Sequence, residues 1–172
     1  YEALHVFDQF HLGGPAATRE LAGHADLKDA TLLDVGCGIG GPARMLAVEF
    51  GCDVTGVDLT ESYVAAAHEL SGWVGLRERT RFACASALHL PFADESWDTA
   101  MTQHAIMNIP DKARMYAEVA RVLKPGGRFV HHDIVAGTTR EPYFPVPWAS
   151  TPAGSFLLPA SDVHDRLREA GL

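Results

Sequence analysis

A run of glycines that directly follows a short apolar segment restricts the fold of this chain more than any other feature. It lies in residues 32–41, Leu-Leu-Asp-Val-Gly-Cys-Gly-Ile-Gly-Gly, and an apolar stretch follows at 43–50. A strand that runs into glycines and then into a helix lets a ligand approach the backbone and the unpaired amides of the helix N-terminus. No Gly-Lys-Ser or Gly-Lys-Thr sequence is present here, which argues against a P-loop and phosphoryl transfer.

Short apolar runs alternate with amphipathic ones along the chain, which predicts β-α-β units and a parallel sheet in an α/β fold. Strands are expected at 31–35, 53–58, 81–84, 97–102 and 128–133, and helices at 42–50, 61–70, 112–123 and 162–170. Lys-Pro-Gly-Gly at 124–127 is expected to end the third helix. Ser161 is expected to cap the last helix and Gly171 to end it.

Length, charge and cysteine content limit the number of domains, the kinds of partner and the cellular compartment. A length of 172 residues predicts one domain, and a net charge of −8 with scattered cations argues against nucleic acid as a partner. Cys37, Cys52 and Cys84 match neither a disulfide framework nor a zinc motif, which favours a reducing, cytoplasmic setting. The uncharged stretch 142–161 contains five prolines, so no membrane-spanning helix is expected there.

Two carboxylates indicate what the glycine loop could bind. Asp58 ends the second expected strand 22 residues after Gly36, where an acid can accept both hydroxyls of a ribose. Asp34 precedes the glycines by two residues and suits a ligand with positive charge, because it would repel a pyrophosphate. The alternatives are a structural carboxylate bonded to loop amides for Asp34 and a helix cap at 61–70 for Asp58.

Four motifs carry a family resemblance. They are Leu-Asp-Val-Gly-Cys-Gly-Ile-Gly at 33–40, Val-Asp-Leu at 57–59, Leu-Pro-Phe-Ala-Asp-Glu-Ser-Trp-Asp at 90–98 and Arg-Val-Leu-Lys-Pro-Gly-Gly-Arg-Phe at 121–129. In this order and spacing they resemble class I S-adenosylmethionine-dependent methyltransferases over residues 29–135. The stretch 8–18 resembles the N-terminal segment of small-molecule methyltransferases of the UbiE and sarcosine/dimethylglycine type.

The resemblance implies a Rossmann-like, doubly wound parallel sheet with strand order 3-2-1-4-5. It implies one methyltransferase domain with an N-terminal segment at 1–28, a cofactor-binding core at 29–135, a proline-rich substrate loop at 136–160 and a helix at 161–172. Members of this family continue into a sixth and a seventh strand, so the chain is expected to lack these two strands and to be a fragment.

The resemblance also implies the cofactor contacts. The backbone of Gly36, Cys37 and Gly38 would pass beneath the methionine part of the cofactor, near Asp34, and Asp58 would hold the ribose hydroxyls. The remaining contacts would be Leu59 packed on the adenine, Ser86 and Ala87 along the edge of the base, and Gln103 beside the sulfonium. Many family members have an acid where Ser86 stands, and serine is shorter and uncharged. For Cys37 a small loop-filling residue is favoured over a reactive thiol.

Histidines and aromatic residues are candidates for the acceptor side. His104, at the end of the fourth expected strand, could remove a proton from the acceptor, and His11 and Asn108 are the candidate substrate contacts. The alternatives are that backbone groups satisfy His104 and that His11 lies on the surface. No metal is expected at His131, His132 and Asp133, since neighbouring strand residues point to opposite faces. Three aromatic residues could hold an ammonium group or simply pack the loop: Tyr143, Phe144 and Trp148.

The sequence therefore predicts transfer of a methyl group from S-adenosylmethionine to an amine, hydroxyl or activated carbon of a small molecule, with release of S-adenosylhomocysteine. No metal, nucleic acid or membrane partner is expected. Two alternatives stay open: a nicotinamide-dependent oxidoreductase and a non-catalytic cofactor-binding domain.

Overall fold

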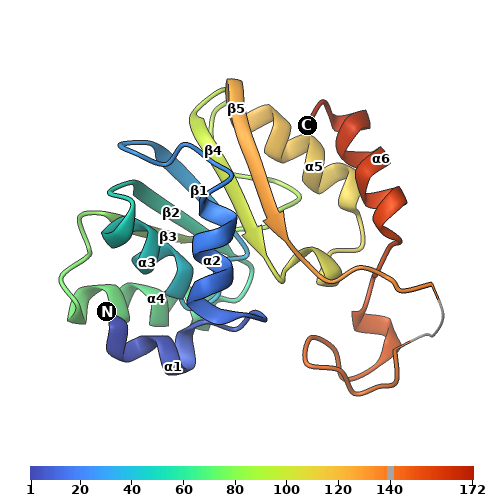
Figure 1. Ribbon diagram of the computed structural model, residues 1–172, viewed down its shortest axis with the longest axis horizontal. Helices are drawn as coiled ribbons and strands as arrows, with labels where there is room; N and C mark the ends of the chain where they lie inside the picture. The colour runs from blue at the N-terminus through green and yellow to red at the C-terminus, as the bar shows by residue number, and fades with distance from the viewer. Residues whose placement is uncertain (139–141) are drawn as a thin grey trace.

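A parallel β-sheet with helices on both faces forms the centre of the molecule (Figure 1). The computed structural model describes residues 1–138 and 142–172. The strand order β3-β2-β1-β4-β5 confirms the predicted fold class, and each neighbouring pair is parallel. The strands are β1 (Thr31–Val35), β2 (Asp53–Asp58), β3 (Thr80–Cys84), β4 (Trp97–Gln103) and β5 (Leu123–His132).

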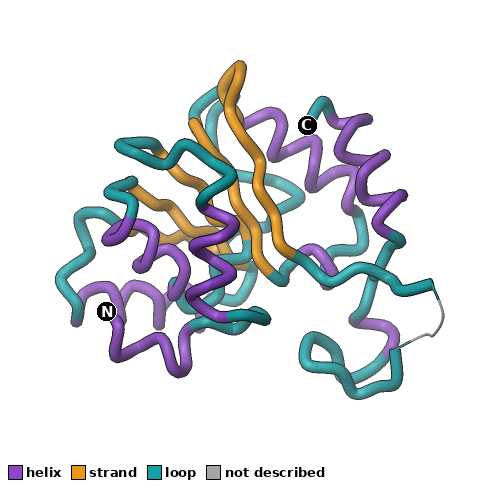
Figure 2. Tube along the Cα trace, viewed as in Figure 1, coloured by secondary structure: helices purple, strands orange, loops and turns teal. Residues whose placement is uncertain are grey.

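Helices lie on either side of the strands, as the tube in Figure 2 shows. One side carries α2, α3 and α4, and the other carries α5 and α6. The helices are α1 (His5–Asp8), α2 (Gly14–Ala22), α3 (Gly41–Glu49), α4 (Glu61–Trp73), α5 (Lys112–Val122) and α6 (Ala160–Ala170). Short 3₁₀ turns occur at Glu2–Leu4, Ile106–Asn108 and Pro152–Gly154.

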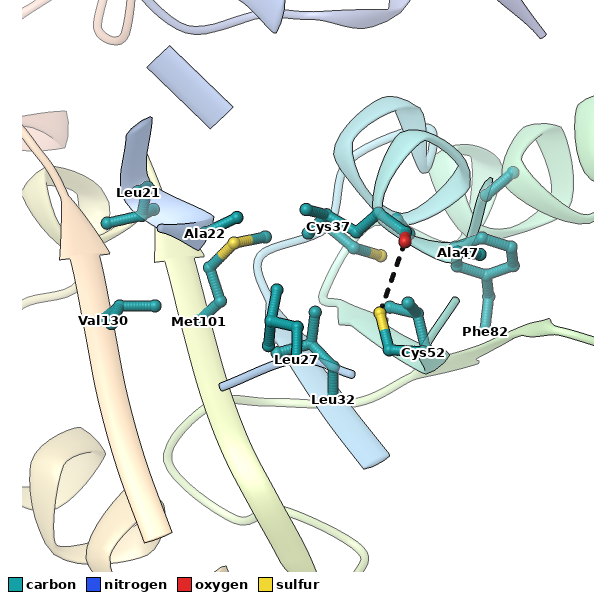
Figure 3. Packing of buried hydrophobic residues seen from close by; sticks show 14 of the residues in the cluster. Leu21, Ala22, Leu27, Leu32, Cys37, Ala47, Cys52, Phe82, Met101 and Val130 are labelled. Atoms are coloured by element: carbon teal, nitrogen blue, oxygen red, sulfur yellow. Dashed lines mark hydrogen bonds between the residues drawn. The ribbon is translucent and has the colours of Figure 1, made fainter. Parts of the chain in front are cut away.

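The central strand β1 packs into both layers of the core. Leu32 and Leu33 are both fully buried, and they belong to the clusters on opposite faces of the sheet. A strand covered on both sides reads as a continuous apolar run, which explains why the sequence identifies β1 so clearly. Figure 3 shows the cluster that contains Leu32, in which the Cys52 thiol donates to the Leu46 carbonyl oxygen over 3.4 Å.

Two sets of charged side chains stabilise the starts of β1 and β4 and the loops beside them. The Asp98 carboxylate accepts from Lys124 Nζ at 2.6 Å and from the amide and hydroxyl of Thr31, and these bonds hold its pKa at about 2. Arg121 donates to the carbonyl oxygens of Leu90 and Phe92 and pairs with Glu118. The sequence motifs at 90–98 and 121–129 thus supply side chains that stabilise the fold.

The structure corrects several expected boundaries. The expected helix stop at 124–127 lies within β5, because this strand starts at Leu123 opposite Trp97 and bulges before Arg128 pairs with Thr99. The expected cap at Ser161 is wrong: α6 starts at Ala160 after Pro159, and the Ser161 hydroxyl donates to Asp162. Gly171 does end α6, in the left-handed conformation with φ 85°.

The proline-rich segment is attached to the sheet through the chain that follows β4. The Phe156 amide donates to the Met107 carbonyl oxygen at 2.8 Å, and Lys112 Nζ donates to the carbonyl oxygens of Ile109 and Phe156. Lys112 is almost fully buried. Burial lowers the pKa of its ammonium group, because a buried charge is costly. The two carbonyl contacts offset part of this cost.

Of the helices within residues 1–138 and 142–172, none has the length and apolar character needed to cross a membrane.

A buried ion pair fastens the N-terminal segment to α3. Arg44 Nη2 lies 2.9 Å from Asp8 Oδ2, and both side chains are 1% exposed. Arg44 also donates to Ala67 O and to Ser71 Oγ on α4. A Cβ on Gly41 would overlap the carbonyl oxygen of Asp8, so only glycine permits this approach. The segment after α1 is thereby held against the start of α3.

We predict that Arg44→Met lowers the free energy of unfolding by about 3–5 kcal/mol, because it leaves the Asp8 carboxylate buried without its cation. The double variant Asp8→Leu/Arg44→Met should regain most of this loss, since no unpaired charge stays buried. Urea denaturation of the two single variants and the double variant measures the coupling.

Arg19→Met is the matched control for this cycle. It breaks the Arg19–Glu49 pair, whose side chains are 49% and 23% exposed, and it should cost less than ~1 kcal/mol. An Arg44→Met variant as stable as Arg19→Met would show that the buried pair does not anchor the segment.

Candidate functional site

A cavity of about 930 Å³ opens at the carboxyl ends of the strands, beneath the N-terminal segment 8–12. Parallel α/β sheets bind their ligands at this edge, where β1 lies between β2 and β4 and the chain order reverses. Leaving aside the aromatic residues of the proline-rich loop, all but one of the residues that the sequence analysis placed at the site line this cavity. They are His11, Gly36, Cys37, Gly38, Asp58, Leu59, Ser86, Ala87, Gln103, His104 and Asn108.

The glycine loop is tightly packed where it leaves the end of β1. Gly36 has φ 81°, and a Cβ there would overlap the Cβ of Ala105 in the loop after β4. The amides of Gly36 and Cys37 both donate to the Val57 carbonyl oxygen, at 2.8 and 3.0 Å. Gly38 has φ 54° and open space where a side chain would stand, apart from Phe10 at 3.6 Å. The loop thus presents bare backbone to the cavity.

Asp34 is the exception: it lies behind the loop, 2% exposed, and does not line the cavity. Its Oδ2 is buried and has no hydrogen-bond partner among the described residues, so the loop amides do not hold this oxygen. Burial, and secondarily the charge of Asp58, raise the pKa of Asp34 to about 7. A cation or a hydrogen-bond donor near this carboxylate would stabilise its charged form.

Asp58 joins the glycine loop to the start of α4. Its Oδ2 accepts from the Gly38 amide and its Oδ1 from the Thr60 amide, each at 2.9 Å. Thr60, and not Asp58, is the residue at the helix N-cap. Because a carboxylate can accept about four hydrogen bonds, both oxygens keep capacity for a ligand's hydroxyl groups.

Apolar side chains flank Asp58 at the rim. Leu59 is 75% exposed although it is a leucine, and Phe10 and Tyr63 stand nearby with ring centroids 6.4 Å apart. Ser86 also lines the cavity, and its hydroxyl accepts from the Leu88 amide at 3.2 Å.

Cys37 fills space between the glycine loop and β2. It is 5% exposed, and its sulfur would collide with a Cβ on Gly56 of β2. Burial, followed by the charges of Asp34 and Asp58, raises the pKa of this thiol. The thiolate is therefore strongly disfavoured.

Three histidines cluster together: His11 and His104 line the cavity, and His132 lies beside them outside the lining. The ring centroids of His11 and His104 are 6.2 Å apart, those of His104 and His132 4.9 Å, and those of His11 and His132 6.2 Å. His11 is buried, so the surface alternative is wrong. His104 has φ 50°, its Nε2 has no partner among the described residues, and burial lowers its pKa. Burial also lowers the pKa of His11, to about 4, and in both histidines this shift favours the uncharged ring.

The structure gives Gln103 and Asn108 structural contacts in addition to their place at the cavity. Gln103 Oε1 accepts from the Thr18 hydroxyl at 3.0 Å. Asn108 Nδ2 donates to the carbonyl oxygens of Trp148 and Gly154, each at 2.9 Å, and so attaches the proline-rich segment. Of the three aromatic residues considered for an ammonium cage, Trp148 lines the cavity, whereas Tyr143 is 93% exposed and Phe144 lies outside the lining.

No group of three or more His, Cys, Asp or Glu side chains that could hold a metal ion occurs in the described part of the chain. Asp133 instead caps backbone: its carboxylate accepts from the amides of Ala105, Ile106 and Met107 at 2.7–3.2 Å. The expectation that the site needs no metal stays a prediction.

Sequence reasoning did not identify Arg44 and Thr18, which support the site from behind, and it considered His132 only as a metal ligand. It also missed the rim residues Phe10 and Tyr63. Their distant neighbours are brought together only by the fold, as with Thr18 and Gln103, which are 85 positions apart. The one available signal was the N-terminal stretch 8–18, which contains Thr18.

Known proteins similar to this chain share its core. A family profile described as "Methyltransferase domain" matches residues 33–131. Methyltransferase GfsG of Streptomyces halstedii is 40% identical over 108 residues, which cover 63% of this chain and 39% of that protein. The 24-methylenesterol C-methyltransferase 2 of Oryza sativa is 41% identical over 104 residues, 60% of this chain and 29% of that protein. The chain thus spans well under half of these relatives.

Two solved structures share the fold. The [4+2]-cyclase SpnF has a TM-score of 0.77 at 32% identity, covering 90% of this chain and 56% of SpnF. Phosphoethanolamine N-methyltransferase 2 of Haemonchus contortus reaches a TM-score of 0.84 at 24% identity over 99% of this chain and 40% of that protein, which bears on the fold alone. The family profile covers more than half of the chain, and this chain therefore belongs to the class I S-adenosylmethionine-dependent methyltransferases.

Proposed function

We propose that this chain binds S-adenosylmethionine and transfers its methyl group to a small-molecule acceptor, with release of S-adenosylhomocysteine. The observation that carries the proposal is the buried Asp34 carboxylate, whose Oδ2 has no partner among the described residues and which lies behind a glycine loop that exposes its backbone. The names of the similar proteins GfsG and 24-methylenesterol C-methyltransferase 2 support it.

The residues at the cavity fit the cofactor. Asp34 would favour the ammonium group of its methionine part, and the backbone of 36–38 would leave room for that part. Asp58 would accept the ribose hydroxyls with the lone pairs that the amides of Gly38 and Thr60 leave open. Leu59 would pack on the adenine, with Ser86 and Ala87 along its edge. When bound, S-adenosylmethionine supplies a methyl carbon that its sulfonium makes electrophilic.

The protein itself would position the acceptor and exclude water from the site. Holding an acceptor in line with a reactive carbon can supply ~7–11 kcal/mol of the barrier. The segment 8–12, anchored by the Asp8–Arg44 pair, covers the glycine loop and would exclude water from it. His104 lines the same cavity, and its Nε2, which has no partner among the described residues, could take a proton from the acceptor.

The acceptor would occupy the part of the cavity between the histidines and the proline-rich segment. Met107, Ile109, Ile134 and Trp148 line this part, together with Asn108. Within the proposed single domain, 29–135 would thus hold the cofactor and also supply most of the acceptor's lining, and the substrate loop 136–160 would add Trp148. We favour a small amine or a natural-product-like acceptor. All three cysteines are free thiols, which fits a reducing compartment such as the cytoplasm.

A second candidate function is a reaction other than methyl transfer on the same cofactor-binding fold. The observation that favours it is the likeness to SpnF, a [4+2]-cyclase, over 90% of this chain. A nicotinamide-dependent function is disfavoured, because the buried Asp34 would repel a pyrophosphate. Binding and group transfer therefore need separate measurements.

We predict that Asp34→Asn weakens binding of S-adenosylhomocysteine but stabilises the ligand-free protein above pH 7. The pKa of Asp34 is raised from 3.8 to about 7 on folding, so the folded state holds more protons between these values and loses stability as pH rises through them. The asparagine variant lacks this loss, which is of the order of a few kcal/mol. Calorimetry of binding and thermal unfolding at pH 4 and pH 8 measure both effects.

Asp26→Asn, the same change at an exposed position, is the control and should alter neither property. Wild-type affinity in Asp34→Asn would contradict the assignment of this carboxylate to the cofactor.

Group transfer is tested with S-adenosylmethionine that carries an isotope-labelled methyl group, incubated with the protein and a metabolite extract. We expect mass spectrometry to find a product heavier than its precursor by one labelled methyl group. Gly38→Val should abolish the product by obstructing the site. Gly51→Val should not, although Gly51 also has positive φ and open space around it.

An enzyme that binds S-adenosylhomocysteine but labels nothing in a broad acceptor panel would favour the second candidate function. Equal product from Gly38→Val and the wild-type protein would contradict the location of the site.

A further inference from the structure

A tight turn of the proline-rich segment reaches the cavity. Val146 and Ala149 pair through two backbone hydrogen bonds, at 2.9 and 3.1 Å, and so close a turn with Pro147 and Trp148 at its tip. Both tip residues line the cavity. Since a turn closed by two hydrogen bonds holds its tip in a defined place, Trp148 forms a fixed part of the cavity wall.

Further hydrogen bonds fix the ring and the backbone of Trp148. Its indole Nε1 donates to Ser155 Oγ at 3.0 Å, and its carbonyl oxygen accepts from Asn108 Nδ2 at 2.9 Å. The same amide nitrogen donates to the Gly154 carbonyl oxygen, also at 2.9 Å. Because both partners are carbonyl oxygens, which only accept, the orientation of the Asn108 amide is fixed by its contacts. Asn108 thus uses both amide hydrogens to attach the turn to the loop after β4.

The side chains beside this turn are apolar. Met107 and Ile109 line the cavity from the loop after β4, and Ile134 lines it from the end of β5. Asp133 precedes Ile134, but it lies outside the lining, and both of its carboxylate oxygens accept from backbone amides. An apolar molecule that leaves water for this part of the cavity would therefore gain by the hydrophobic effect.

The same part of the cavity offers no counter-charge for a cation. Within the described lining, the only carboxylates are those of Asp8 and Asp58. Asp8 is paired with Arg44 and its side chain is 1% exposed, whereas Asp58 accepts from amides of the glycine loop and the start of α4. An ammonium group beside Trp148 would have one aromatic face in exchange for its hydration, and the sulfonium of the proposed cofactor would repel it.

We infer that the turn at Pro147 and Trp148 sets the acceptor specificity of this protein. The Trp148 indole packs on the apolar body of an uncharged acceptor, and Asn108 is the positioning residue that holds the turn in place. This inference rests on the proposed function, and of the acceptors favoured above it selects the natural-product-like molecule over the small amine. It concerns the body of the acceptor and not the atom that receives the methyl group.

The preference for an uncharged body is tested with tert-butylbenzene and phenyltrimethylammonium. The two probes have the same shape, but a positively charged nitrogen in the second replaces a carbon in the first. Each is titrated into the chain loaded with S-adenosylhomocysteine, and nuclear magnetic resonance follows the indole N–H signals of the three tryptophans, with Trp148 assigned through Trp148→Phe. We expect tert-butylbenzene to shift the Trp148 signal and phenyltrimethylammonium to bind at least about tenfold more weakly.

The contribution of the ring is measured with Trp148→Ala. Binding of tert-butylbenzene should weaken by about tenfold or more, as for a buried aromatic anchor. Trp73→Ala is the matched control, because Trp73 is 75% exposed and lies outside the lining, and it should leave the binding unchanged.

The positioning role of Asn108 is tested with Asn108→Asp, which keeps the shape of the side chain but places an acceptor where both carbonyl oxygens need a donor. The Trp148 signal should move in the probe-free protein and tert-butylbenzene should bind more weakly, while the affinity for S-adenosylhomocysteine stays the same. A Trp148 signal that keeps its wild-type position would refute this role. The probe titration of the wild-type chain does not depend on whether any variant folds.

The inference on specificity is overturned if phenyltrimethylammonium binds as tightly as tert-butylbenzene, if neither probe binds, or if tert-butylbenzene binds without shifting the Trp148 signal. The proposed function is judged separately, by binding of S-adenosylhomocysteine and by transfer of labelled methyl. A protein that passes those two tests and prefers the cation refutes only the role of the turn.

Discussion

The close contact between the loop after β1 and the loop after β4 is the constraint on which this molecule depends. Gly36 must be glycine because Ala105 occupies the space of its side chain, and Asp133 at the end of β5 holds Ala105 in place through backbone amides. The two loops leave β1 and β4 where the strand order reverses. Their packing fixes the backbone that lines this part of the cavity, with Asp58 in the lining and Asp34 buried outside it.

Internal charges shape the rest of the site in two different ways. Arg44 and Asp8 neutralise each other in the interior and so hold the N-terminal segment over the cavity. Asp34 has no such cation, and its raised pKa reflects a cost that the ligand-free fold carries. A buried unpaired acid destabilises a scaffold but suits a binding site, because the missing partner can come from the ligand.

Local pattern was sufficient for the parts of the fold that local interactions decide. β1 and β2 have the predicted bounds, because both are short apolar runs bounded by polar or turn residues. β5 begins five residues earlier than expected, since pairing of Leu123 with Trp97 overrides the turn signal of Lys-Pro-Gly-Gly. Ser161 failed as a cap because Pro159 already sets the start of α6. The same holds at the cavity: spacing placed Gly36 and Asp58 in its lining, but it also placed Asp34 there, which lies outside the lining, whereas Thr18 and Arg44 depend on partners far away in sequence.

Thermal unfolding with each ligand tests most directly whether this strand-loop-helix binds a nucleoside that carries an ammonium group rather than a dinucleotide. A ligand at one hundred times its dissociation constant stabilises the folded state by ~2.7 kcal/mol, which is a clear shift in Tm for a domain of this size. S-adenosylmethionine and S-adenosylhomocysteine should raise Tm, and NAD should leave it unchanged. Stabilisation by NAD alone would contradict the account.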